Sequence, residues 1–207
     1  MEPGRREQAP GTLRLLQQFV NTYNIEREQI GLRTEEFASP ADLRRWLVSH
    51  ALLPRDARVR TLELKRTLEV REALRRLLLA HNGWPMDSTT VAVLNRLARD
   101  ARLVVRLQRD GQMRLEPDAA GLTGALGRLL SVAFMAEIEG TWQRLKACRR
   151  CHWAFYDHSR NRSGRWCAMS ICGNRTKAQA YRSRHRVKTR PRPRLASAIL
   201  HGRARSR

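Results

Sequence analysis

Apolar residues recur three or four positions apart over most of the first 146 residues, the spacing of amphipathic helices. Residues 13–23 form the first such stripe. Ser39 and the proline and acid that follow it predict a helix over residues 40–50, because serine caps helix N-termini and proline suits the first helical position. Further stripes predict helices over residues 56–81, over residues 89–99 with Ser88 as the cap, and over residues 121–146.

One segment alternates apolar and polar residues instead. Leu103–Leu107 and Met113–Leu115 are separated by Asp110-Gly111, a dipeptide typical of hairpin turns, so the sequence predicts a β-hairpin here. Residues 13–140 are therefore expected to form a mostly helical α+β domain. The residues before it, 1–12, are rich in proline and glycine and are expected to be a disordered leader.

All four cysteines lie in the last third of the chain, as Cys148-x2-Cys151 and Cys167-x4-Cys172. Two close pairs of thiolates are typical ligands of a structural zinc ion, and the alternative is a pair of disulfides. The N-terminus has no apolar segment of the kind found in secretory signal peptides, which predicts a reducing, cytoplasmic location where disulfides are rare. We therefore expect one Zn²⁺ bound by the four cysteines.

Charge is distributed very unevenly. The formal net charge is +22, and residues 141–207 carry 19 basic groups against one acid, whereas residues 1–140 carry 22 basic groups against 18 acids. Such a concentration of positive charge attracts a polyanion. An anionic membrane is disfavoured because no amphipathic apolar face accompanies the charge and no apolar run reaches the roughly 18 residues of a membrane span. DNA is the expected partner, and RNA is the alternative.

The residues around the last cysteine resemble a known family. Cys172-Gly173-Asn174-Arg175, preceded by SRNRSGRWCAMSI, resembles the CGNR zinc finger of bacterial transcription regulators, which follows an N-terminal ABATE domain. Matching N-terminal features are the FVNT run at 19–22, SPADLRRWL at 39–47 and LEVREALRRLLLA at 68–80. The resemblance implies an ABATE-like domain over residues 13–140 and a zinc finger over residues 141–190.

Within the expected finger, residues 153–156 and residues 166–167 are each predicted to form a short strand, and a helix should run from Asn174 to about Arg186. The segment 191–207 is basic and has too few apolar residues to fold alone, so we expect a disordered tail. Trp153 and Trp166 are expected to form a small core beside the metal.

The expected nucleic-acid contacts are basic residues in the turn before the helix and along the helix itself. They are Arg160, Arg162, Arg165, Arg175, Lys177, Arg182, Arg184 and Arg186. The helix has no acidic partners that would relieve its self-repulsion, and phosphates would do so. Asn174 is expected to cap the helix rather than read a base. Arg175 could read a base, contact phosphate or pair with Asp157, the only acid of the region.

Three polar residues interrupt apolar stretches of the N-terminal domain. Asn21 and Thr22 follow the first apolar stripe, and Arg71 interrupts the long stripe of residues 56–81. The simpler interpretation is a buried hydrogen bond together with a surface arginine. The alternative, by analogy with regulators that carry a sensor domain, is a pocket for an unknown small molecule.

Together these features predict a cytoplasmic, zinc-dependent DNA-binding protein that acts as a transcription regulator. Two alternatives remain: an RNA- or ribosome-associated zinc protein, and a protein-interaction adaptor. The sequence contains no P-loop, GxGxxG, GxSxG or HExxH motif, so no enzymatic activity is expected. It leaves the oligomeric state open.

Overall fold

The computed structural model describes residues 7–25 and 35–188, with side chains to residue 185. A helical body contains α1 (Leu13–Val20), α3 (Pro40–Ser49), α4 (Thr61–Ala80), α5 (Ser88–Asp100), β1 (Leu103–Leu107), β2 (Met113–Pro117) and α6 (Gly121–Ile138). A finger unit follows, with the 3-10 turn η1 (Trp142–Arg144), β3 (Leu145–Ala147), β4 (Ala154–Tyr156), the π-helical turn η2 (Met169–Gly173) and α7 (Asn174–Lys188). The predicted α+β fold class is confirmed, and the predicted tail of residues 191–207 lies outside the described residues.

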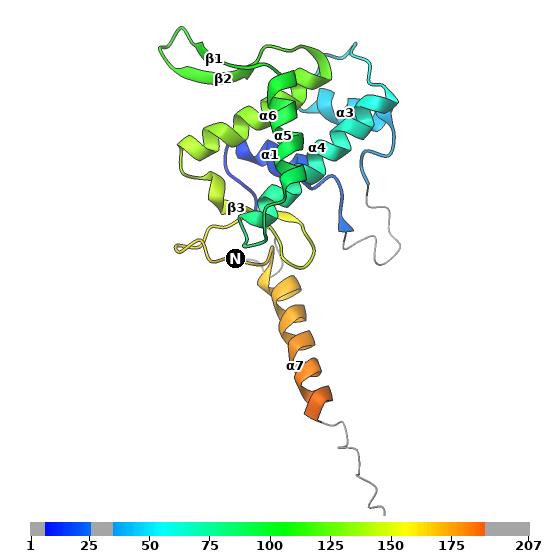
Figure 1. The fold of residues 1–207 in the computed structure, drawn as a ribbon, viewed down its shortest axis with the longest axis vertical. Coiled ribbons are helices and arrows are strands. Elements are labelled where there is room, and N and C mark those ends of the chain that lie inside the picture. The colour runs from blue at the N-terminus through cyan, green and yellow to red at the C-terminus, as the bar shows by residue number, and fades with distance from the viewer. Residues whose placement is uncertain (1–6, 26–34, 189–207) are drawn as a thin grey trace, which may run out of the picture.

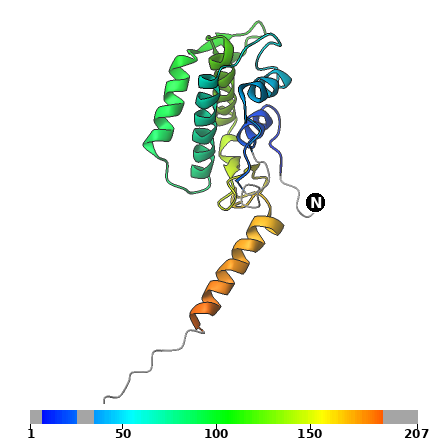
Figure 2. The same ribbon diagram turned by 90° about the vertical axis from the view of Figure 1, so that its right-hand side faces the viewer.

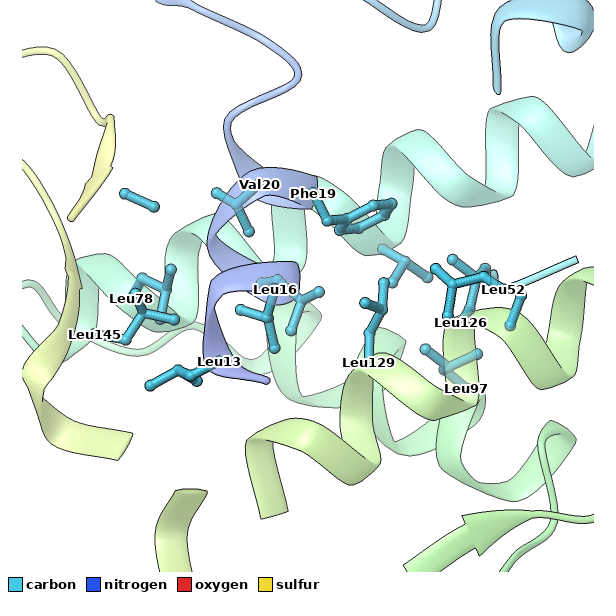
Figure 3. Close-up of a cluster of buried hydrophobic side chains, with 14 of the residues drawn as sticks. Leu13, Leu16, Phe19, Val20, Leu52, Leu78, Leu97, Leu126, Leu129 and Leu145 are labelled. Carbon is cyan, nitrogen blue, oxygen red and sulfur yellow. The ribbon is translucent and has the colours of Figure 1, made fainter. Parts of the chain in front are cut away.

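The helices of the body pack around one hydrophobic core, with α4, α5 and α6 side by side (Figures 1 and 2). Figure 3 shows the centre of this core, where α1 contributes Leu16 and Phe19 and α6 contributes Leu126 and Leu129. All four side chains are buried. Removal of this apolar surface from water is the main force that holds the helices together.

Helix α6 is the one helix in the described ranges that is long and apolar enough to cross a membrane, judged by length and composition alone, with a mean hydropathy of 1.3. Its residues Leu122, Leu126 and Leu129 are buried in the core of the body. A central helix of a globular core has this same composition, because it is covered by neighbouring helices on more than one side.

Local capping explains where the helices of the body begin. Ser39 precedes α3 as predicted, and its hydroxyl accepts a hydrogen bond from the Asp42 backbone N at 3.2 Å. The prediction that Ser88 caps the next helix is wrong: Asp87 is the cap of α5 and accepts from the Thr90 backbone N at 2.7 Å. Helix α4 begins later than predicted, at Thr61, after an extended residue.

The predicted hairpin is present, with Leu107 paired to Met113 at the turn end and Leu103 paired to Pro117 at the base. Its base lies against α6 at Gly127, where an added Cβ would be 2.7 Å from the Cβ of Ala101 and 2.9 Å from that of Pro117. Only glycine permits this close approach. The close contact fixes the base of the hairpin on the body.

The prediction of one helix from residue 121 to residue 146 is wrong beyond Ile138. Gly140 adopts a positive φ of 68°, a conformation that ends a helix and that glycine adopts at little cost. The chain then forms η1 and strand β3, whose Leu145 pairs with Tyr156 of β4 in an antiparallel ladder. The strand predicted at residues 166–167 is absent, and β3 is the partner of β4 instead.

The described part of the predicted disordered leader, residues 7–12, is held against the body. Ala9 is fully buried, and its backbone N donates to the Gln17 side chain at 2.6 Å. Gln17 in turn donates to the Glu7 carbonyl at 2.8 Å. A glutamine in an apolar stripe therefore binds the segment before the helix, which composition alone does not reveal. Residues 1–6 lie outside the described residues.

The strands of the finger unit complete the core of the body. Leu145 and Ala147 of β3 and Ala154 and Tyr156 of β4 all belong to the same buried cluster as the leucines of the helices. Figure 3 shows Leu145 close to Leu78 of α4. The hydrophobic core thus extends across the boundary expected near residue 140.

Polar side chains of the body also bind the backbone of the finger unit, and we call this contact the seam. Asn21 donates to the Ala154 carbonyl at 2.9 Å and accepts from the Ala154 N at 2.8 Å, as a neighbouring strand would. Asn82 donates to the carbonyls of Ala147 at 2.8 Å and Arg165 at 3.0 Å. Further bonds of the seam are Gln17 to Ala154, Arg75 to the His152 carbonyl, and His81 with the Leu145 carbonyl.

Replacing Asn82 by alanine tests the seam. The change removes two hydrogen bonds and leaves the buried carbonyl of Ala147 without the donor from Asn82, so the free energy of unfolding should fall by about 1–3 kcal/mol. Urea denaturation of the full-length protein measures this loss. Asn95→Ala, at an exposed position of α5, is the matched control. Equal stability of the two variants would contradict the importance of the seam.

Candidate metal centre and basic helix

The structure brings the four cysteines together. Cys148 follows β3, Cys151 lies three residues later, Cys167 precedes η2, and Cys172 lies within it. Their Sγ atoms all lie within 4.8 Å of one another, with 3.5 Å between Cys151 and Cys167 and 3.7 Å between Cys167 and Cys172. All four side chains are buried.

The donor set fits a tetrahedral metal ion. A tetrahedron with metal–sulfur bonds of about 2.3 Å has sulfur atoms about 3.8 Å apart, close to the distances between these thiols. Hydrogen bonding to Cys148 and Cys151 raises the pKa of the Cys167 thiol, as expected where four acidic groups share a small volume. A divalent cation would relieve their mutual repulsion and hold all four as thiolates. No disulfide joins them, and all four are free thiols.

The backbone forms a compact turn around the first pair of ligands. The His152 N donates to the Cys148 carbonyl at 2.9 Å, and the Cys148 N donates to the Trp153 carbonyl at 2.9 Å. His152 adopts a left-handed φ of 56°, unusual for a residue other than glycine. This conformation reverses the chain so that both cysteines of the pair point to the same centre.

The second pair of ligands is positioned by Cys172 and the glycine after it. The Cys172 N donates to the Ala168 carbonyl at 3.0 Å, which places the ligand in the first turn of a helical segment. A Cβ on Gly173 would lie 2.1 Å from the Met169 sulfur and 3.2 Å from the Trp166 ring. A larger residue at position 173 would require the Met169 side chain to move.

A small apolar cluster surrounds the centre. Phe155 is buried against the cysteines, and Trp153, Trp166 and Ile171 are partly buried there. The predicted role of the two tryptophans as the core of the finger is confirmed. By limiting the access of water, these side chains would protect metal–thiolate bonds from competing ligands.

Asn174 is not the cap of the basic helix. Its φ of −66° and ψ of −40° are helical, whereas a cap residue has extended angles. The helical segment begins one turn earlier, after Ala168, which is extended. The prediction failed because the metal ligand Cys172 itself lies in the first turn, so that the helix and the metal centre share residues.

The buried acid of the finger is held by a lysine that the sequence did not single out. Lys146 Nζ lies 2.8 Å from Asp157 Oδ2, and both side chains are almost fully buried. Asp157 also accepts from the backbone N atoms of Ser159 at 3.0 Å and Gly164 at 2.8 Å. Burial alone would raise the pKa of Asp157, but the bonds from Lys146 and Ser159 outweigh it and lower the pKa to about 2.

Asp157 therefore organises the loop of residues 159–165 through its partners. The Lys146 ammonium group also donates to the carbonyls of Arg162 and Gly164, so one buried ion pair holds the start and the end of this loop. Alternation of side chains along β3 could have suggested an inward-facing lysine. The apolar pattern of residues 121–146 predicts a helix, so the sequence indicates neither the length nor the end of that strand.

The three residues of the predicted ligand pocket are placed in two separate networks. Thr22 and Arg71 are in contact, with Arg71 Nη1 donating to the threonine hydroxyl at 3.1 Å, and Arg71 is buried rather than on the surface. Arg71 also forms a bidentate ion pair with Glu35, at 2.6 and 2.7 Å. Asn21 instead binds Ala154 across the seam. The buried polar atoms of the described residues all have partners, so this arginine is part of the structural framework.

The basic residues predicted to contact nucleic acid are on the surface wherever their side chains are described. Arg160, Arg162 and Arg165 lie in the loop before η2, and Arg162 donates to the Gly140 carbonyl at 3.3 Å. The exposed basic residues of α7 are Arg175, Lys177, Arg182 and Arg184. Arg186 also lies in α7, and its side chain is outside the described part of the chain.

Two further residues of this region have partners in the structure. Tyr181 is 59% exposed and packs on His185 one turn later, with ring centroids 4.1 Å apart. Asp157 makes its ion pair with Lys146, so its carboxylate is already engaged where a brace to Arg175 was considered.

We expect the purified protein to contain one divalent metal ion per chain. Replacing Cys148 or Cys172 by serine should abolish stoichiometric binding and lower the melting temperature of the whole protein, because β3 and β4 belong to its core. Elemental analysis and thermal denaturation measure the two effects. Ser163→Ala, in an exposed loop position of the same unit, should change neither. A metal-free parent protein with the same melting temperature as the cysteine variants would contradict the site.

Replacing Asp157 by asparagine should cost about 3–5 kcal/mol of unfolding free energy, because it leaves the buried Lys146 ammonium without its counter-charge. A lowered carboxyl pKa stabilises the fold fully above the unfolded pKa of about 4, and this stabilisation is lost progressively as the pH falls from there through the folded pKa of about 2. The penalty should therefore be constant between pH 6 and pH 8, as measured by urea denaturation. Glu139→Gln, at an exposed position, is the control; a penalty that varies across this window would be inconsistent with the lowered pKa.

Two family models match the chain. One, named ABATE and described as "Putative stress-induced transcription regulator", matches residues 13–139, and the other, the CGNR zinc finger, matches residues 144–185. No curated protein matches it. The first match covers most of the helical body, and the second contains the four cysteines, their surrounding cluster and most of α7. The chain therefore belongs to the ABATE family and carries a CGNR zinc finger after its ABATE domain.

Proposed function

We propose that this protein is a cytoplasmic, zinc-dependent DNA-binding protein that regulates transcription, and that α7 contacts the DNA. The observation that carries the proposal is the position of α7. In Figures 1 and 2 the helix projects away from the body, and all but one of its side chains from Asn174 to His185 are exposed. Because the basic side chains of α7 do not pack in the core, we infer that they bind an anionic partner outside the protein.

The size and charge of α7 support DNA as that ligand. Its 15 residues span about 22 Å, and a helix of this kind fits the major groove of B-form DNA. The sequence of α7 contains no acidic residue. Exposed arginines on several faces can neutralise phosphates on both sides of a groove, which releases counterions and favours binding.

The proposed role of zinc is to fix the direction of this helix. Cys172 lies in η2, which leads directly into α7, and the Thr176 hydroxyl donates to the Cys172 carbonyl at 2.9 Å, so the expected metal ligand and the helix are directly connected. Four thiolates would leave no open position for a catalytic water, and a structural role for zinc follows from that. Metal loss would therefore weaken DNA binding by releasing the helix, without removing any basic residue.

Charge reversal tests the assignment of α7. Arg182→Glu combined with Arg184→Glu should weaken binding of the zinc-loaded protein to duplex DNA and reduce the slope of log K against log salt by about 2, since two phosphate contacts are lost. Fluorescence anisotropy across a salt series measures both quantities. Arg109→Glu with Arg114→Glu, at exposed positions of the hairpin region, gives the same change in net charge as a control.

Three outcomes separate the proposal from its alternatives. Equal binding by the α7 variant and the hairpin control would contradict the role of α7. Binding to structured RNA with higher affinity than to duplex DNA at the same salt concentration would favour an RNA-associated protein instead. Failure of the parent protein to bind either nucleic acid at about 0.15 M salt would favour the adaptor.

A further inference from the structure

A cavity lies beside the seam, between the body and the finger unit. Its volume is about 500 Å³, within the roughly 300–1,000 Å³ typical of small-molecule sites, which occur preferentially at the contacts between structural units. Arg14 and Gln18 of α1 line one side, Trp46 of α3 and His50 at its C-terminal end line another, and Trp153 comes from the finger unit. The cavity is thus built by residues far apart in the sequence.

Aromatic rings supply much of the apolar lining. The rings of Trp46 and His50 are stacked, with centroids 3.9 Å apart and an interplanar angle of 22°. The His50 Nδ1 lies 2.8 Å from the Trp46 carbonyl, which holds the imidazole in this orientation. Trp46 is further fixed by Phe19 and Phe37. Each of the two stacked rings covers one face of the other, so a flat aromatic molecule would pack on the remaining outer face of the pair.

The polar groups of the cavity fall into two sets. Gln17 and Asn21 are held by the Ala9 segment and by Ala154, so they fix the wall of the cavity. The side chains of Gln8, Gln18 and Glu36 make no hydrogen bond within the described residues, and Arg14 makes one long bond of 3.5 Å. Unused amide groups, one acid and one cation therefore face the same space.

The charges in the cavity compensate each other. Arg14 contributes one positive charge and Glu36 contributes one carboxyl group. Partial desolvation and the neighbouring charge of Glu35 raise the pKa of Glu36 above that of an ordinary glutamate. Neither a strongly anionic nor a strongly cationic molecule is favoured by this lining.

We propose that this cavity binds a neutral, planar heteroaromatic molecule of two or three fused rings with hydrogen-bond donors and acceptors at its edges. The outer ring face of the stacked Trp46–His50 pair would pack on its face, and Gln18 and Glu36 would bind its edge. Trp153 lies next to Ala154, which Asn21 and Gln17 hold, so the bound molecule would contact both sides of the seam. This site differs from the network of Thr22 and Arg71, in which Arg71 binds Thr22 and Glu35.

Isothermal titration of the full-length, zinc-loaded protein with lumichrome, a neutral three-ring heteroaromatic, tests the proposal without nucleic acid. Its result is thus independent of whether the protein binds DNA. Saturable binding of one lumichrome per chain is expected. His50→Ala should weaken it roughly tenfold through the lost ring contact, and Gln18→Ala roughly fivefold through the lost hydrogen bond.

Matched controls make the outcome decisive. His185→Ala in α7 and Gln112→Ala in the hairpin turn remove the same side chains elsewhere and should leave lumichrome affinity unchanged. Myo-inositol, which has many hydroxyl groups but no flat face, should give no heat of binding. Absence of lumichrome binding at 1 mM, equal affinity in all four variants, or equal binding of myo-inositol would each overturn the proposal.

Discussion

The docking of β3 and β4 against the helices is the interaction on which the rest of the structure depends. These two strands place Leu145 and Ala154 in the core of the body, and the same hairpin presents Cys148 and Cys151 to the metal centre. Asn21 and Asn82 bind the backbone of the finger unit with hydrogen bonds that a flexible tether could not maintain. The finger is therefore an extension of the helical body, and α7 continues directly from η2 of the finger unit.

This arrangement would link the metal centre to the proposed cavity. A bound metal ion would hold together the turns that carry Cys148 and Cys172, and Cys148 directly follows β3. A molecule bound between α3 and Trp153 would contact the residue before β4, which pairs with β3. A change at one site is therefore expected to alter the free energy of binding at the other.

The sequence was sufficient for those features that depend on local pattern or on ligand chemistry. Helical periodicity located α1, α3 and α4, the Asp110-Gly111 turn located the hairpin, and the cysteine spacing located the metal centre. The end of α6 was misjudged because apolar residues continue past Gly140, and only the positive φ of this glycine shows that the helix has stopped.

Long-range polar contacts could not be predicted from sequence. Lys146 pairs with Asp157 only because a short strand places it inward, and Gln17 looks like an ordinary polar interruption until Ala9 and Ala154 are seen beside it. Arg71 was interpreted as a surface residue or pocket residue, whereas Glu35 neutralises it in the interior. In each case the partner comes from a segment whose path depends on the whole fold.

The central claim is that α7, held by the metal centre, is the element that contacts DNA. Hydrogen–deuterium exchange of the full-length, zinc-loaded protein with and without duplex DNA tests it most directly. The account predicts slower exchange on DNA binding in residues 174–188 and in the loop of residues 159–165, with exchange in α5 unchanged. Protection confined to the helical body, with α7 exchanging as fast as in the free protein, would contradict it.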